Sequence, residues 1–218
     1  MGIAVLVLGE SGSGKSASLR NFNKQDVRIM NVASKPLPFK NTKGLLKADK
    51  ATYAMIKNVV KSNEALSYVI DDAQYLMAFE SFAKANETGY GKFTVLAKNF
   101  EEMLQSLQED TSPNTITYVL QHIDRDDNGN IKAKTLGKML DNQLSVEGLF
   151  AIVLLAQTDG KTHYFLTQND GTHPAKTPIG MFEESRIDND LKFVDDKIRE
   201  YYGLQKQPTE TTAKGAKK

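Results

Sequence analysis

The feature that most constrains the fold of this chain is an apolar run followed directly by a glycine-rich segment. Ile3–Leu8 are all apolar, and the next residues, Gly9–Ser16, read GESGSGKS. A short continuous apolar run indicates a strand buried on both faces, as in a parallel sheet. The segment after it matches G-x-x-x-x-G-K-[ST] at every fixed position and leads into a helix predicted at Ser16–Phe22. A strand, a glycine turn and a helix in this order predict a phosphate-binding loop.

Each residue type in this loop has a physical reason to bind a nucleotide. The glycines let backbone N–H groups curl around phosphate oxygens, and the start of the following helix adds positive potential. Lys15 is expected to reach the β and γ phosphates of ATP, and the hydroxyl of Ser16 to ligate Mg²⁺. We predict that the nucleotide contacts the loop along its length, at Gly9, Glu10, Ser11, Gly12, Ser13, Gly14, Lys15, Ser16 and Ala17.

An acidic pair supplies the carboxylates that such a loop needs from the end of a neighbouring strand. Leu66–Asp71 reads LSYVID, and Asp72 follows it. Asp71 is expected to hold Mg²⁺ through water, and Asp72 to orient or deprotonate the attacking water. The alternative is that the pair only caps the helix predicted at Ala73–Ala85, because aspartate is a good N-cap.

The rest of the chain alternates strands and helices and then closes with a hairpin. We expect strands at Val27–Val32 and Thr115–His122, helices at Lys50–Lys61, Phe93–Gln108, Thr135–Leu144 and Leu191–Tyr202, and a hairpin of Phe150–Ala156 with Thr162–Thr167 around the Asp-Gly of QTDGK. This order predicts a three-layer α/β fold with a mainly parallel central sheet. We expect one domain at residues 1–203 and a disordered polar tail at residues 204–218.

Composition excludes several functions. The chain has no cysteine, so disulfides, zinc–thiolate sites and thiol catalysis are excluded. The net charge is +1, from 28 basic and 27 acidic residues, which neither indicates nor excludes a nucleic-acid partner. The apolar start is too short for a signal peptide, and no run reaches the roughly 18 apolar residues of a membrane span. We therefore expect no membrane partner and a cytoplasmic location.

The strand at Thr115–His122 ends in two polar residues, Gln121 and His122. A polar side chain at the carboxyl end of a strand in an open parallel sheet faces the ligand crevice, so either could hydrogen-bond the γ-phosphate. The stretch that follows, DRDDNGNIKAKT, matches a calcium-binding loop except that Thr135 stands where the pattern requires glutamate. Because it follows a strand, we interpret DDNGN as the turn of a flexible loop or hairpin, where Asp, Asn and Gly tolerate positive φ.

In the order of these parts the chain resembles the RecA-core ATPases, the P-loop group that includes recombinases and ring helicases. The resemblance covers roughly Gly2–Gln168 and rests on GESGSGKS, YVIDDAQYL, YVLQH, KTLGKML and the late block YFLTQNDGTHPAKTPIGMFE. Within that group the chain is most similar to short single-domain ATP-binding proteins of bacteriophages, some of them RecA-like recombination proteins. The resemblance implies that the chain binds and hydrolyses ATP with Mg²⁺ and acts in phage recombination or replication, in the host cytoplasm.

The resemblance also implies roles for the end of the Gln121 strand and the loop after it. Gln121 matches the glutamine by which RecA-core proteins couple the state of the γ-phosphate to a following loop that contacts single-stranded DNA. Here that loop is Ile123–Lys134, and its candidate DNA contacts are Arg125, Lys132 and Lys134. Subunits of this group bind nucleotide at interfaces, so a homo-oligomer, as a ring or a filament, is implied. Phage recombination or replication proteins are the implied protein partners.

Departures from the family pattern leave other functions open. RecA recombinases carry a catalytic glutamate at the end of another strand, but VRIMNVASKP offers no acid, which shifts the base role to Asp72. One alternative is a nucleotide-switched assembly or loader protein without fast turnover, which shares every motif. Another is a small-molecule kinase. Such kinases clamp phosphoryl groups with several arginines from a mobile lid, whereas the arginines of this chain are scattered along it.

Overall fold

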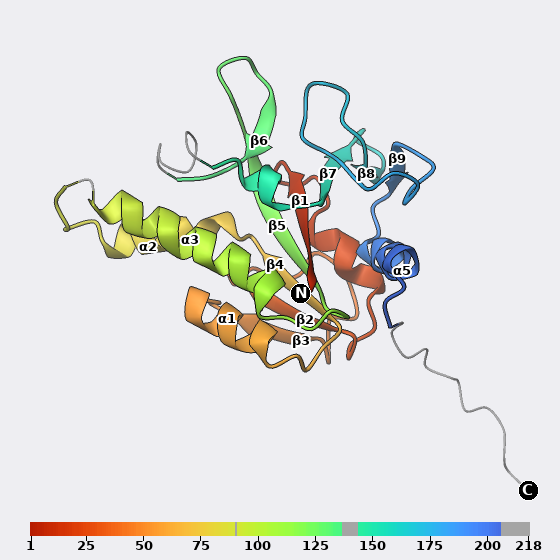
Figure 1. Cartoon of the computed structure of the whole chain (residues 1–218), viewed down its shortest axis with the longest axis horizontal. Helices are drawn as coiled ribbons and strands as arrows, with labels where there is room; N and C mark the ends of the chain where they lie inside the picture. The colour runs from red at the N-terminus through yellow and green to blue at the C-terminus, as the bar shows by residue number, and fades with distance from the viewer. Residues whose placement is uncertain (90, 137–143, 206–218) are drawn as a thin grey trace, which may run out of the picture.

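The computed structural model describes residues 1–89, 91–136 and 144–205 of the chain. These residues form an α/β fold in which helices cover both faces of one large, mostly parallel sheet (Figure 1). The prediction of an α/β fold with a mainly parallel central sheet is therefore confirmed. No helix in this described part is long and apolar enough to cross a membrane.

The sheet of the described residues has nine strands, with β1 near its centre. The order across it is β3-β2-β4-β5-β1-β7-β8-β9, and β6 pairs with β5 off this path. The pairs β5–β6, β7–β8 and β8–β9 are antiparallel, and the others are parallel. The bounds are β1 Ile3–Gly9, β2 Val27–Asn31, β3 Leu46–Asp49, β4 Ser67–Asp71, β5 Ile116–Arg125, β6 Ile131–Ala133, β7 Ile152–Thr158, β8 His163–Leu166 and β9 Arg186–Asp188.

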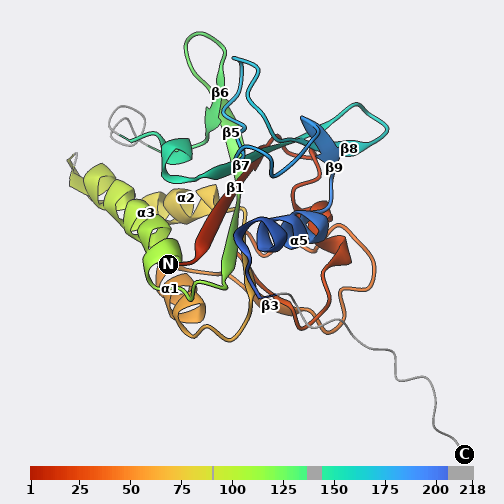
Figure 2. The ribbon, with the colours of Figure 1, turned by 45° about the vertical axis from the view of Figure 1, so that its right-hand side comes forward.

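Two groups of helices cover the two faces of the sheet (Figures 1 and 2). Helices α1, α2 and α3 pack on one face, and α5 packs on the other with the short helix η1. Side-chain caps fix two of the helix starts: the side chain of Thr52 accepts the N–H of Met55 before α1, and that of Asp190 accepts the N–H of Lys192 before α5. The bounds are η1 Ser16–Asn21, α1 Tyr53–Lys61, α2 Gln74–Ala83, α3 Gly91–Glu109, η2 Val146–Leu149 and α5 Leu191–Tyr202.

Strand β1 is buried on both faces, as its unbroken apolar run predicts. Leu6 and Leu8 belong to the core cluster beneath α1, α2 and α3, whereas Val5 and Val7 belong to the cluster beneath η1 and α5. Successive side chains of a strand point to opposite faces, so this strand anchors both halves of the core. The loop that follows β1 is consequently attached to a strand that is buried on both faces.

Some predicted elements differ in kind or were missed. The helix predicted at Ser16–Phe22 is the 3₁₀ helix η1. Strands β3 and β9 were not predicted, because each has only three or four residues and lacks a clear apolar alternation. Of the two possibilities for DDNGN, the structure has the hairpin, formed by β5 and β6. Most of the predicted helix Thr135–Leu144, and residues 206–218 of the predicted tail, lie outside the described residues.

Candidate functional site

Three segments that are far apart in the sequence meet at one edge of the sheet. They are the glycine-rich loop after β1, the acidic pair at the end of β4, and the end of β5. Strand β5 lies between β1 and β4, and its residues Gln121 and His122 are in register with Leu8 and Gly9. Because these strands are parallel, their carboxyl ends open at the same edge, where open α/β sheets bind ligands.

The glycine-rich loop needs its glycines because other groups approach closely. A Cβ atom on Gly9 would lie 2.3 Å from Oγ of Ser13 and 2.7 Å from the backbone oxygen of Ala156. Gly14 has a φ of +95°, and a Cβ atom there would lie 2.9 Å from the ring of His163 on β8. The loop is therefore packed between the sheet and the β7–β8 hairpin, and its shape is fixed on that side.

Lys15 folds back over this loop. Its Nζ donates hydrogen bonds to the backbone oxygens of Gly9 and Glu10, both at 2.8 Å, and the residue is only 6% exposed. Burial lowers the pKa of Lys15 to about 8, against the attraction of Asp72 and Asp71. The hydrogen-bond partners of this cation are neutral carbonyl groups, so its charge is not neutralised by a direct contact.

Ser16 and Asp71 are in direct contact. Oγ of Ser16 donates to Oδ1 of Asp71 at 2.8 Å, so the two residues predicted to ligate Mg²⁺ lie together. Burial, and then the charge of Asp72, raises the pKa of Asp71 above its usual value. Within residues 1–89, 91–136 and 144–205 no three acidic or histidine side chains gather as a metal cage. A magnesium ion at this pair would take its other ligands from phosphate oxygens and water, as is common for Mg²⁺.

Asp72 is buried with both of its carboxylate oxygens engaged. Nζ of Lys35 lies 2.5 Å from Oδ2, and Nε2 of His122 lies 3.3 Å from Oδ1. Burial acts to raise the pKa of Asp72, but the contacts with His122 and Lys35 outweigh it and lower the pKa to about 2. A carboxylate with so low a pKa accepts protons poorly at neutral pH. The predicted role of Asp72 as a base therefore requires a change of partners.

Lys35 is the residue of this cluster that sequence reasoning missed. It follows β2 in a segment with two prolines, and its Nζ also lies 5.6 Å from the ring centroid of Tyr75. No local pattern singles out this lysine. The available signal is topological: Asn31 at the end of β2 is in register with Asp71, so the segment after β2 opens at the same sheet edge.

The end of β5 connects this cluster to the β5–β6 hairpin. Gln121 is fully buried, and its Nε2 donates to the backbone oxygen of Lys134 at 2.6 Å. The N–H of Lys134 in turn donates to the backbone oxygen of His122 at 2.8 Å. His122 contacts Asp72, so Lys134 at the root of the hairpin is linked through His122 to the acidic pair.

The hairpin divides the three candidate DNA contacts between its two faces. Lys132 lies directly opposite Asp124, and Arg125 lies opposite Ile131. Opposite residues share a face and neighbours alternate, so Lys132 is on one face and Arg125 on the other. Lys134 follows β6, and its N–H continues the pairing of the two strands by donating to the backbone oxygen of His122, so alternation predicts that it shares the face of Lys132. The sequence showed the three charges within one segment but not this separation.

The tip of the hairpin is held by one carboxylate. Oδ1 of Asp126 accepts the N–H groups of Asn128 at 2.9 Å and Asn130 at 2.8 Å. The resemblance to a calcium loop therefore reflects a turn in which Asp126 binds backbone N–H groups. Strand β6 is also tied to the segment between β8 and β9, since Ile131 N–H donates to the oxygen of Thr172 at 3.0 Å, and the two lie side by side in both views (Figures 1 and 2).

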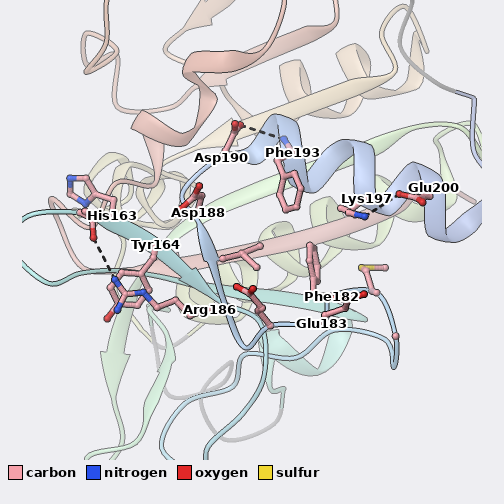
Figure 3. A pocket seen from close by; sticks show the side chains of 15 residues that line it. His163, Tyr164, Phe182, Glu183, Arg186, Asp188, Asp190, Phe193, Lys197 and Glu200 are labelled. Atoms are coloured by element: carbon pink, nitrogen blue, oxygen red, sulfur yellow. Dashed lines mark hydrogen bonds and ion pairs between the residues drawn. The ribbon is translucent and has the colours of Figure 1, made fainter.

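A separate hollow of about 1030 Å³ lies between α5 and the strands β8 and β9 (Figure 3). Phe182 and Phe193 line it side by side, with ring centroids 6.4 Å apart, and the guanidinium of Arg186 stacks on the ring of Tyr164 at 3.6 Å. His163 lines the hollow and also packs against Gly14. The residues predicted to bind the nucleotide and Mg²⁺ lie at the sheet edge and do not line this hollow.

Neither the protein-family models nor the curated protein sequences contain a match to this chain. The functional conclusion therefore depends on the residues at the sheet edge. These residues combine a glycine-rich loop, a buried lysine, a serine–aspartate contact and a second carboxylate with two partners.

Proposed function

We propose that this chain is a P-loop ATPase of the RecA-core type, which binds Mg·ATP on the loop at residues 9–17 and hydrolyses it. The observation that carries the proposal is the hydrogen bond from Ser16 to Asp71. It joins the hydroxyl that follows the loop lysine to the carboxylate that ends a second parallel strand. A hydroxyl and a carboxylate in this position would hold a Mg²⁺ ion beside the phosphates of a bound nucleotide.

The loop residues also fit a triphosphate. Among the described residues, the hydrogen-bond partners of Lys15 are the carbonyl oxygens of Gly9 and Glu10, so phosphate oxygens can replace them as stronger partners. Oγ of Ser13 is buried and has no hydrogen-bond partner among the described residues, which leaves a donor available at the loop. When bound, Mg²⁺ would neutralise charge on the phosphates, while Asp71 would hold the ion through water and Asp72 would orient the attacking water.

Action on DNA is the second part of the proposal. The hydrogen bonds of Gln121 and His122 to Lys134 support a path by which nucleotide state reaches the β5–β6 hairpin. Lys132 and Lys134 share one face of that hairpin and can contact the phosphates of single-stranded DNA. The chain would act in this way in phage recombination or replication, as a homo-oligomer.

A nucleotide switch with slow turnover is the second candidate. It is favoured by the low pKa of Asp72, about 2, which limits proton transfer while Lys35 and His122 hold this carboxylate. The kinase alternative has less support, because every arginine has a partner elsewhere. These partners are Asn189 for Arg20, Glu64 for Arg28, Gly129 for Arg125, Asp159 for Arg186 and Asp195 for Arg199.

The proposal is tested by the rate of ATP hydrolysis at increasing concentrations of single-stranded DNA. The mass of the assembly is measured under the same conditions. Magnesium-dependent hydrolysis that DNA accelerates, in an assembly larger than one chain, is the expected result. Tight Mg·ATP binding with no turnover in either condition would favour the switch. Turnover that DNA leaves unchanged would remove the DNA part of the proposal and leave the nucleotide site.

A further inference from the structure

Two hydrogen bonds hold the segment around Lys35 beside the acidic pair. The backbone oxygen of Lys35 accepts Nδ2 of Asn31 at 2.7 Å, and Oγ of the preceding Ser34 accepts the N–H of Lys50 at 2.8 Å. Asn31 is 1% exposed and is in register with Asp71. The position from which the lysine side chain extends is therefore defined by a buried residue of the sheet.

The side chain of Lys35 has more freedom than the carboxylate it contacts. It is 56% exposed, whereas the side chain of Asp72 is 5% exposed. A lysine is a compact charge on a flexible stem, so it can turn from a fixed carboxylate to another nearby anion. Lys35 contacts Asp72, and Ser16, the neighbour of Lys15, contacts Asp71. The two lysines therefore belong to the same cluster around the acidic pair.

We propose that Lys35 recognises the terminal phosphate of ATP: it pairs with Asp72 in the absence of nucleotide and moves to the γ-phosphate when Mg·ATP is bound. This inference rests on the proposed nucleotide site. A terminal phosphate carries roughly two negative charges near neutral pH, against one on a carboxylate, so it attracts the ammonium group more strongly. ADP lacks the γ-phosphate, so with ADP bound Lys35 should stay paired with Asp72.

The move of Lys35 would also activate Asp72. The ion pair between Lys35 and Oδ2 of Asp72, 2.5 Å long, would be lost, and this oxygen would become free to accept a hydrogen bond from the attacking water. The oxygen of a water molecule then bonds to the terminal phosphorus as its proton passes to Asp72. The bond from that phosphorus to the bridging oxygen breaks, and ADP leaves with its electron pair. Hydrolysis and the recognition of a triphosphate thus depend on one lysine.

This inference is tested by calorimetric titration of the full chain in the presence of Mg²⁺. The two ligands are ATPγS, which is hydrolysed slowly, and ADP. Lys35→Ala should weaken ATPγS binding about ten-fold, the scale of one lost charge-assisted hydrogen bond, and should leave ADP binding within about two-fold. Lys35→Arg keeps the charge and should retain most of the preference for ATPγS. Lys40→Ala, at an exposed lysine of the same segment, is the matched control and should change neither affinity.

Two outcomes would overturn the inference: unchanged ATPγS affinity in Lys35→Ala, or an equal loss of affinity for both nucleotides. If Lys35→Ala does not fold because Asp72 has lost its partner, the double variant Lys35→Ala/Asp72→Asn removes the unpaired charge. The same loss of preference for ATPγS is expected of that double variant. Wild-type protein that binds neither nucleotide would overturn the proposed nucleotide site, and this inference with it.

Discussion

At Asp72, the backbone conformation decides where the side-chain carboxylate lies. Its φ is +63°, in the left-handed region that aspartate and asparagine tolerate better than most residues. This conformation turns the chain away from β4 directly after Asp71. It places the second carboxylate where a lysine from the segment after β2 and a histidine from β5 both reach it. Asparagine can keep this conformation, which makes Asp72→Asn an informative substitution.

We predict that Asp72→Asn binds Mg·ATP but hydrolyses it about 10²- to 10⁴-fold more slowly, because the proton acceptor is lost. Binding by calorimetry and release of phosphate under saturating ATP measure the two effects separately. Glu10→Gln is the matched control, since Glu10 is an exposed acid within the loop. If Asp72→Asn retained full turnover and Glu10→Gln lost it, Glu10 would be the base.

The pKa of Lys15 predicts how nucleotide affinity depends on pH. Lysine is charged below its pKa, so with a pKa of about 8 the cation that binds phosphate is present at pH 7 and lost above pH 8. Affinity for Mg·ATP should be constant from pH 7 to about 8 and then fall by up to about ten-fold per pH unit. Titrations between pH 7 and 9.5 measure this. In Lys15→Arg, which stays charged, the fall should be absent, and a fall of the same size there would assign it to another group.

At the scale of elements, the β5–β6 hairpin separates its charges by strand alternation. Lys132 lies on the face of Asp124 and Arg125 on the other face, while Lys134 follows β6 and its N–H donates to the backbone oxygen of His122. We predict that the double variant Lys132→Ala/Lys134→Ala weakens binding of single-stranded DNA equally for all sequences and lowers the salt slope by up to about two units. Affinity measured over a range of salt concentrations checks this. Nucleotide binding should be unchanged.

Arg125→Ala tests which face of the hairpin meets DNA. Its guanidinium donates to the oxygen of Gly129 at 2.9 Å, within the turn. We expect a smaller change in the salt slope than in the lysine variant. If Arg125→Ala weakened DNA binding more than the two lysine substitutions together, the contact face would be the opposite one.

Much of the element order follows from the sequence, and the exceptions have physical reasons. Ile3–Leu8 predicts a buried central strand because a short unbroken apolar run needs to be buried on both faces. Asp190 and Gly203 are the cap residues at the two ends of α5. Ser16 and Asp71 were each predicted as a ligand of Mg²⁺ from their places after β1 and at the end of β4, and the structure places them in contact. Lys35 was missed because its role depends on which strand lies next to β4, and a single sequence does not give strand order.

At the scale of the whole molecule, a buried network joins α5 to the sheet edge opposite the candidate site, where the parallel strands β4 and β5 begin. Arg199 donates to Oδ2 of Asp195 at 2.7 Å and to the backbone oxygens of Leu66 and Asn114. Both charged side chains are completely buried, and Asp195 also accepts the hydroxyl of Tyr118 at 3.1 Å. The network ties α5 to the starts of β4 and β5, away from the candidate site.

We predict that Arg199→Met lowers the free energy of unfolding by about 3–5 kcal/mol, because it leaves the charge of Asp195 buried and unpaired. Urea denaturation measures the change. Lys197→Met, on the same helix with an exposed ion pair to Glu200, is the control and should change stability by less than about 1 kcal/mol. A loss as small as that of the control in Arg199→Met would mean that the network does not stabilise the fold.

The central claim, that the sheet edge is a magnesium–triphosphate site, is tested most directly by equilibrium titration of the full chain with ATP at pH 7.5. We predict saturable binding of one ATP per chain that requires Mg²⁺, is lost in Lys15→Ala because the buried cation over the loop is gone, and loses its dependence on Mg²⁺ in Ser16→Ala. Binding of equal strength in wild type and Lys15→Ala, or no binding to the wild type at millimolar ATP, would contradict the account.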